Sequence, residues 1–117
     1  MRTGKILDWH DMDETAYRAS QICRILGNPK AFRMLLEIRR LGTATPTELA
    51  LLVDRSVPTV SLTLKSLRQA QLVRYQRDGS TALYRLKSPR VAGALHEMES
   101  LAAHLMRPGR RKVPRRP

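Results

Sequence analysis

The sequence predicts a mainly α-helical domain with one small β-hairpin, in the order α-α-α-α-β-β-α. Along most of the chain, apolar residues recur every three or four positions, which is the spacing of amphipathic helices. Pairs of a capping residue and a proline, such as Asn28-Pro29, precede several of these stretches and are typical of helix starts. From Leu72 the spacing becomes that of strands, and Asp78-Gly79 between them favours a hairpin.

Two helices are expected before residue 42. The first covers residues 12–26 and ends at Gly27. The second begins at Asn28-Pro29 and runs to about Arg40, and Leu41-Gly42 ends it. Each helix has one apolar stripe: Met12, Ala16, Ala19, Ile22, Cys23 and Leu26 in the first, and Ala31, Met34, Leu35, Ile38 and Leu41 in the second.

Two shorter helices follow, joined by a tight connection at residues 53–55. Thr45-Pro46-Thr47-Glu48 has the pattern of a capping box, with proline at the first helical position. Ser56 caps the second short helix, which runs to about Gln69. We expect the first short helix to be buried through Leu49, Leu51, Leu52 and Val53, and the second through Val57, Val60, Leu64 and Leu67.

A hairpin and a final helix complete the expected domain of residues 1–106. Residues 72–77 and 81–86 have strand character, and Ser88-Pro89 opens a helix that extends to about Met106. Residues 107–117 hold six basic residues, three prolines and little apolar surface. We therefore expect a basic disordered tail there, since burial cannot offset the entropy of ordering it.

The charge of the chain favours a polyanionic partner. Lys and Arg number 22 against 10 Asp and Glu, a net charge of +12. Residues 55–90 contain eight basic residues and one acid. Nucleic acid is the favoured partner, and an anionic membrane surface is the alternative. There is no apolar run of 18 residues, no signal-peptide core near the N-terminus and a single cysteine, so we expect a cytoplasmic protein that does not span a membrane.

Two short helices followed by a hairpin form the pattern of a winged helix-turn-helix. In that arrangement the second helix enters the major groove of double-stranded DNA, so its outward side needs small hydrogen-bonding residues and cations. The hairpin supplies cations to the DNA backbone or an adjacent minor groove. The predicted DNA-binding residues are Ser56, Pro58, Thr59, Ser61, Leu62, Thr63 and Lys65 on the helix, and Arg74, Arg77 and Ser80 on the hairpin.

From residue 25 to residue 86 the chain resembles the ArsR/SmtB-type winged-helix repressors. The resemblance is carried by residues 26–29 (LGNP), 33–35 (RML), 47–50 (TELA), 56–67 (SVPTVSLTLKSL), 70–73 (AQLV) and 84–86 (YRL). It implies a dimer that represses a promoter and releases it when an inducer binds.

A homodimer is also expected from the first and last helices. Their apolar stripes extend beyond what a core of this size can cover, and pairing them across a two-fold axis buries the remainder. Such a dimer predicts an inverted-repeat operator. The alternative is that both helices close over a single core. The predicted dimerisation residues are Met12, Ala16, Ala19, Leu95, Met98, Leu101 and Leu105.

The sequence predicts no cofactor, no metal site within one subunit and no catalytic site. Cys23 lies on an apolar stripe, where we expect a small core residue. His96 and His104 are two turns apart, so a metal shared by them requires two subunits. No nucleophile-and-base set or phosphate-binding loop is present, so the protein is not expected to be an enzyme. A small-molecule or metal inducer is not identified by the residues.

Two other functions remain compatible with the same fold. An architectural or partition-type protein would coat DNA without choosing a short site. A winged helix used as a protein-interaction module would show no salt-dependent affinity for DNA.

Overall fold

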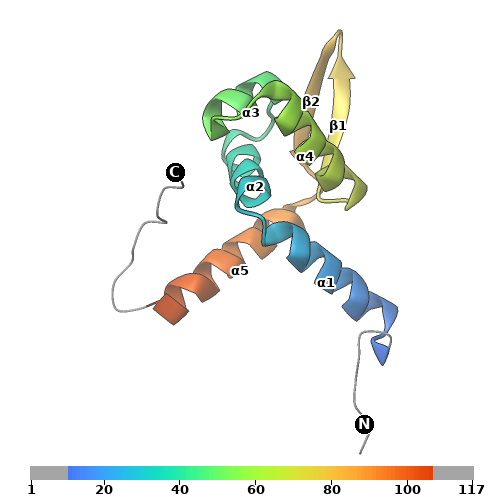
Figure 1. Cartoon of the computed structure of the whole chain (residues 1–117), viewed down its shortest axis with the longest axis vertical. Helices are drawn as coiled ribbons and strands as arrows, with labels where there is room; N and C mark the ends of the chain where they lie inside the picture. Colours follow the sequence, from blue (N-terminus) through green and yellow to red (C-terminus); the bar gives the residue numbers. More distant parts are fainter. Residues whose placement is uncertain (1–10, 107–117) are drawn as a thin grey trace, which may run out of the picture.

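The computed structural model describes residues 11–106, which form five helices and one antiparallel hairpin in the predicted order (Figure 1). The elements are α1 (Glu14–Leu26), α2 (Pro29–Leu41), α3 (Pro46–Val53), α4 (Val57–Gln69), β1 (Val73–Asp78), β2 (Thr81–Leu86) and α5 (Pro89–Met106). The predicted tail at 107–117 lies outside the described residues. No helix between residues 11 and 106 has the length and apolar character needed to cross a bilayer.

The helix starts follow the capping chemistry predicted from the sequence. The Asn28 side chain accepts hydrogen bonds from the backbone N–H groups of Lys30 and Ala31 at the start of α2. Thr45 and Glu48 form a reciprocal capping box at α3, with distances of 3.1 and 2.8 Å. Each cap satisfies N–H groups that have no partner inside the helix, so these short local patterns determine where the helices begin.

The core lies between α2, α3, α4 and the base of the hairpin. In Figure 1, α2 occupies the centre, with α3, α4 and the hairpin on one side and the diverging α1 and α5 on the other. The buried side chains are all apolar: Ala31, Met34, Leu35, Ile38, Ala44, Leu49, Ala50, Val60, Leu64, Leu67, Leu72, Val73 and Leu95. At about 25 cal/mol per Å² of buried apolar surface, this cluster is the main stabilising contribution to the fold.

The hairpin pairs Val73 with Leu86 at its base and Asp78 with Thr81 at its tip. The loop therefore consists of Gly79 and Ser80, one position later than the predicted Asp78-Gly79 turn. Gly79 has a φ of 66° and Ser80 does not share this positive φ, as in a type II′ turn with glycine first. Ala44 adds a short bridge to Tyr84 with backbone hydrogen bonds of 2.9 and 2.8 Å, which joins the start of α3 to the hairpin.

Several predicted core positions are wrong. Leu51 is 81% exposed, and Val57 and Leu41 are each 41% exposed. Cys23 is also exposed rather than a core residue, and Met12 precedes α1, whose N-cap is Asp13. Apolar spacing places a side chain on one stripe of a helix, but the edge of that stripe is buried only where another element covers it.

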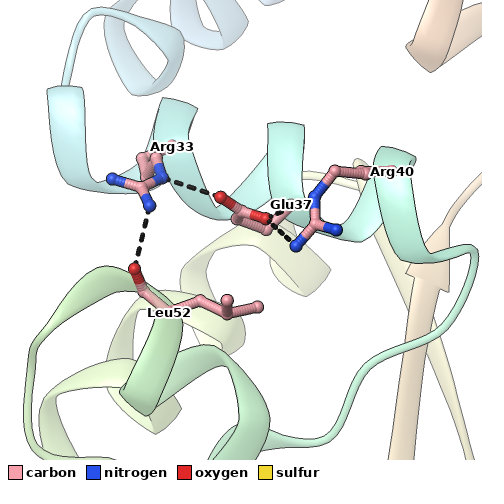
Figure 2. Close-up of polar contacts among 4 residues, drawn as sticks. All are labelled: Arg33, Glu37, Arg40 and Leu52. Carbon is pink, nitrogen blue, oxygen red and sulfur yellow. Dashed lines mark hydrogen bonds and ion pairs between the residues drawn. The ribbon is translucent and has the colours of Figure 1, made fainter.

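An ionic cluster joins α2 to α3 (Figure 2). Glu37 accepts hydrogen bonds from Arg33 Nε at 2.9 Å and from Arg40 Nε and Nη2 at 3.0 and 2.8 Å. Arg33 also donates through Nη2 to the backbone carbonyl of Leu52 at 2.9 Å. That carbonyl lies in the last turn of α3, where carbonyls lack helical partners, so Glu37 orients an arginine that caps the next helix.

The surroundings of Glu37 favour its ionised form. Hydrogen bonds from Arg40 and then Arg33 lower the pKa of Glu37, although partial burial opposes them. Because the pKa of Glu37 is lower in the folded state than in the unfolded state, its contribution to the free energy of unfolding is fully present above the unfolded pKa. It is lost as the pH falls through the folded pKa.

We expect Glu37→Gln to lower the free energy of unfolding at neutral pH by about 1 kcal/mol, since the paired arginines remain partly exposed. The deficit relative to the unsubstituted protein should shrink as the pH falls through the lowered pKa of Glu37, because its carboxylate then becomes protonated and loses the ionic contacts. Urea unfolding at fixed protein concentration, at neutral and acidic pH, measures both values. Glu97→Gln is the matched control, because Glu97 is exposed in the middle of α5. An equal deficit in both variants would contradict a specific role for Glu37.

Candidate nucleic-acid interface

Helix α4 has one fully buried side and one open side. Val60, Leu64 and Leu67 follow one another at intervals of four and three residues, and none of them is accessible to solvent. Ser61 and Lys65 on the opposite side are exposed, and Leu62 is 69% exposed. The buried stripe fixes the rotation of the helix about its axis, so the hydroxyl, the aliphatic chain and the ammonium group stay accessible together.

The start of α4 orders the neighbouring hydroxyl groups. Ser56 caps the helix by accepting from the Thr59 N–H at 3.3 Å, and its hydroxyl donates to Thr59 Oγ1 at 2.9 Å. Thr63 donates to the Thr59 carbonyl at 3.2 Å. Thr59 and Thr63 are half-buried, whereas Ser56 and Pro58 are exposed. Within the predicted set, Ser56 and Pro58 are thus accessible, and the two threonines are only partly accessible.

The hairpin is held against α4 by an aromatic stack. The guanidinium carbon of Arg68 lies 4.5 Å from the centre of the Tyr75 ring, and Tyr75 stacks on Tyr84 with centroids 5.4 Å apart. Arg68 was missed from the sequence, although Ser61, Lys65 and Arg68 follow one another at intervals of four and three residues. Its cation–π contact joins the end of α4 to the first strand of the hairpin.

The tip of the hairpin presents the predicted cation. Arg77 and Ser80 are exposed, and Arg77 Nη1 donates to the Ser80 carbonyl at 3.3 Å across the turn. The contact orients the guanidinium at the end of the wing. Arg55, in the connection between α3 and α4, is a further exposed cation next to Ser56 that the sequence reasoning did not select. Its position directly before the helix cap is the signal that identifies it.

Arg74 does not join the other predicted DNA-binding residues. Side chains alternate between the two faces of a strand, and Tyr75 faces the α4 side through its contact with Arg68. Arg74 therefore lies on the other face, opposite Arg85 in the register and next to the end of α2. Its assignment to the α4 surface is corrected, because a one-residue step along a strand reverses the face.

Helices α1 and α5 diverge from the core and expose apolar side chains (Figure 1). No residue of α1 is fully buried, and Leu95 is the one fully buried residue of α5. Leu95 belongs to the core of the single chain, so its assignment to the dimer surface is wrong. The other apolar residues of α5 are accessible: Met98 is 39% exposed, Leu101 53%, Leu105 70% and Met106 45%. Ala16 is half-buried and Ala19 is exposed on α1.

Residues 11–106 contain no group of three His, Cys, Asp or Glu side chains placed to hold a metal ion. His96 and His104 are both exposed on α5.

Comparisons with known proteins agree on the architecture. The solved homodimeric DNA-binding domain of a possible ArsR-family transcriptional regulator from Mycobacterium bovis superimposes with a TM-score of 0.74, covering 86% of this chain and 96% of that chain at 21% identity. NolR from Sinorhizobium fredii gives a TM-score of 0.70, with 83% and 95% coverage and 26% identity. The chain has the winged helix-turn-helix fold of ArsR-family regulators.

A sequence comparison points to the same group. Over 79 residues the winged-helix chain is 37% identical to the HTH-type transcriptional regulator KmtR of Mycobacterium tuberculosis. The match covers 61% of this chain and spans 58% of the length of that relative. No protein-family model matches the chain.

Truncation of a side chain is expected to cost much more stability on the buried side of α4 than on its open side. Val60→Ala should lower the free energy of unfolding by about 2 kcal/mol, because it leaves a cavity in the core. Leu62→Ala, two residues further along the helix, should change it by less than about 0.5 kcal/mol, since most of that side chain is already in water. Urea unfolding of the two variants measures this difference. Similar losses for both would show that α4 is rotated from the orientation described here.

Proposed function

We propose that the chain is a sequence-specific DNA-binding transcriptional regulator that acts as a homodimeric repressor in the cytoplasm, and not an enzyme. The observation that carries this proposal is the open side of α4, where Ser61, Leu62 and Lys65 stay accessible because the opposite stripe is buried. A rigid helix with this composition on one side suits insertion into the major groove. The comparison with KmtR, itself a transcriptional regulator, supports the proposal.

In this function some residues contact the DNA bases and others position the protein on the phosphate backbone. Ser61 and the Leu62 side chain contact base edges, where leucine packs against a thymine methyl group. Lys65 binds phosphate, and the cap at Ser56 directs the N-terminus of α4 toward the backbone. Arg77 and Ser80 reach from the wing to the adjacent backbone or minor groove. Thr59 and Thr63 serve mainly to shape this surface.

The homodimer forms through α1 and α5. Met98, Leu101 and Leu105 lie at intervals of three and four residues on the exposed side of α5, so together they form an apolar stripe that water alone covers in a single chain. A second copy of the same helices covers it through a two-fold contact, in which each surface meets its own equivalent. The two α4 helices then occupy successive major grooves, roughly 34 Å apart.

Sequence-specific binding is tested with DNA selected from a random pool by the full chain. Selection should enrich one inverted repeat, and Ser61→Ala with Lys65→Ala should weaken binding to it by about tenfold to a hundredfold. The slope of log affinity against log salt should also become shallower by about 0.9, since one phosphate contact is lost. Fluorescence anisotropy at several salt concentrations provides these values.

Arg18→Ala is the control for the change in net charge, since Arg18 is an exposed residue of α1. It should leave the affinity within about twofold of the unsubstituted protein, because it removes a charge away from the proposed contact surface. Unspecific enrichment of the pool would favour an architectural DNA-binding protein. Absence of any salt-dependent affinity would favour a protein-interaction module.

Dimerisation through α5 is tested by Leu101→Gln. The substitution should raise the dimer dissociation constant by about tenfold or more, because a polar amide replaces an apolar contact in the interface. Leu51→Gln is a matched control, since Leu51 is equally apolar and 81% exposed on α3. Analytical ultracentrifugation over a concentration series measures both constants. A monomer at all concentrations, or equal effects of the two substitutions, would exclude this interface.

A further inference from the structure

A basic groove lies on the side of the hairpin that faces away from α4. It has a volume of about 590 Å³ and opens where the end of α2, the base of the hairpin and the start of α5 meet. Four cationic side chains line it: Arg39, Arg74, Arg85 and Lys87. No carboxylate lines it.

The pairing of the two strands places two of these cations, Arg74 and Arg85, next to each other, so their charges repel. Arg74 and Arg85 are directly opposite in the antiparallel register, and like charges in such positions destabilise a strand pair. Among residues 11–106, neither arginine has an ion-pair partner, and Lys87 also lacks one. Arg39 differs, because it pairs with Glu99 of α5 at 3.0 Å. Three positive charges therefore line one open groove without a counter-charge among residues 11–106.

The groove also offers apolar surface next to its charges. Leu41, Leu86 and Ala92 line it beside the cations. The groove is largely open to solvent, so a ligand there is held mainly by the charges rather than by enclosure. This combination suits a small ligand that carries a phosphoryl group on an apolar or aromatic body. Arginine is well matched to such a group, because its planar fork of donors can bind two phosphoryl oxygens at once.

We propose that this groove binds a phosphoryl group, with Arg74 and Arg85 as the principal ligands and Lys87 as the third cation. The bound anion relieves the repulsion between the two arginines and links the hairpin to the first turn of α5. In the proposed regulator this link connects the DNA-contacting wing to the dimerisation helix, so the ligand is placed to act as an effector. That regulatory consequence rests on the proposed function, whereas binding of the anion does not.

Inorganic pyrophosphate is the probe for a free ligand. Isothermal titration of the full chain, with ionic strength held constant by chloride, should show saturable binding of pyrophosphate. Arg74→Gln with Arg85→Gln should weaken this binding by about tenfold or more, since both charge-assisted contacts are lost. Arg18→Gln with Arg77→Gln removes the same charge outside the groove and should leave the affinity within about twofold.

Folding of the variants is followed by thermal unfolding without pyrophosphate. The groove variant should melt no lower than the unsubstituted protein, because it removes a like-charge pair. Lys87→Gln provides a second, milder variant that leaves the strand pair intact, and it should weaken pyrophosphate binding in the same direction. The proposal would be overturned if the groove variant weakened pyrophosphate binding less than the control pair does. It would also be overturned if the unsubstituted protein gave no detectable heat with pyrophosphate and the groove variant bound DNA like the unsubstituted protein.

The phosphoryl group has two possible sources, a free metabolite or the DNA backbone, and the salt dependence of DNA binding distinguishes them. If the groove holds a free ligand, the groove variant keeps the salt slope of the unsubstituted protein while losing pyrophosphate affinity. If it holds the DNA backbone, the slope becomes shallower by about 0.9, because the two arginines bind one phosphate together. Failure of the proposed function appears separately, as absence of DNA affinity while pyrophosphate still binds.

Discussion

The rotation of α4 about its axis is the constraint on which the rest of the structure depends. Val60, Leu64 and Leu67 are completely buried against the core, so turning the helix would expose them to water at a cost of several kcal/mol in transfer free energy. The core thereby determines which side chains remain outside. The open side of α4 keeps its orientation because hydrophobic packing on the opposite side holds the helix in place.

The orientation of α4 also determines the position of the wing. Arg68 extends from the end of the helix over Tyr75, and Tyr75 stacks on Tyr84 of the second strand. The Ala44 bridge fixes the other edge of the hairpin to the start of α3. Helix, connection and hairpin therefore form one unit. Because strands alternate their faces, the same hairpin presents Arg77 and Ser80 at its tip and keeps Arg74 and Arg85 in a separate groove behind it.

Away from this unit, the fold leaves apolar surface uncovered. Leu95 of α5 is buried in the core, whereas the apolar residues that follow it are exposed. No residue of α1 is completely buried. A single domain of this size has too little remaining surface to cover two diverging helices. The proposed dimer would cover this apolar surface, and the groove residues would then lie between the proposed dimerisation helix and the proposed DNA-contacting wing.

The sequence by itself determined the order of the elements and most of their bounds. Asn28, Thr45 and Ser56 begin helices through hydrogen bonds to residues two or three positions away, and interactions of such short range can be read directly from the chain. The same local periodicity identified Ser61, Leu62 and Lys65 as candidate site residues. Only the tertiary structure decided that Leu51 and Cys23 are exposed, that Leu95 is a core residue, and that Arg74 meets Arg85 rather than α4. Those outcomes depend on which element covers which face. Such contacts join residues that are distant in sequence, and a local sequence pattern does not predict them.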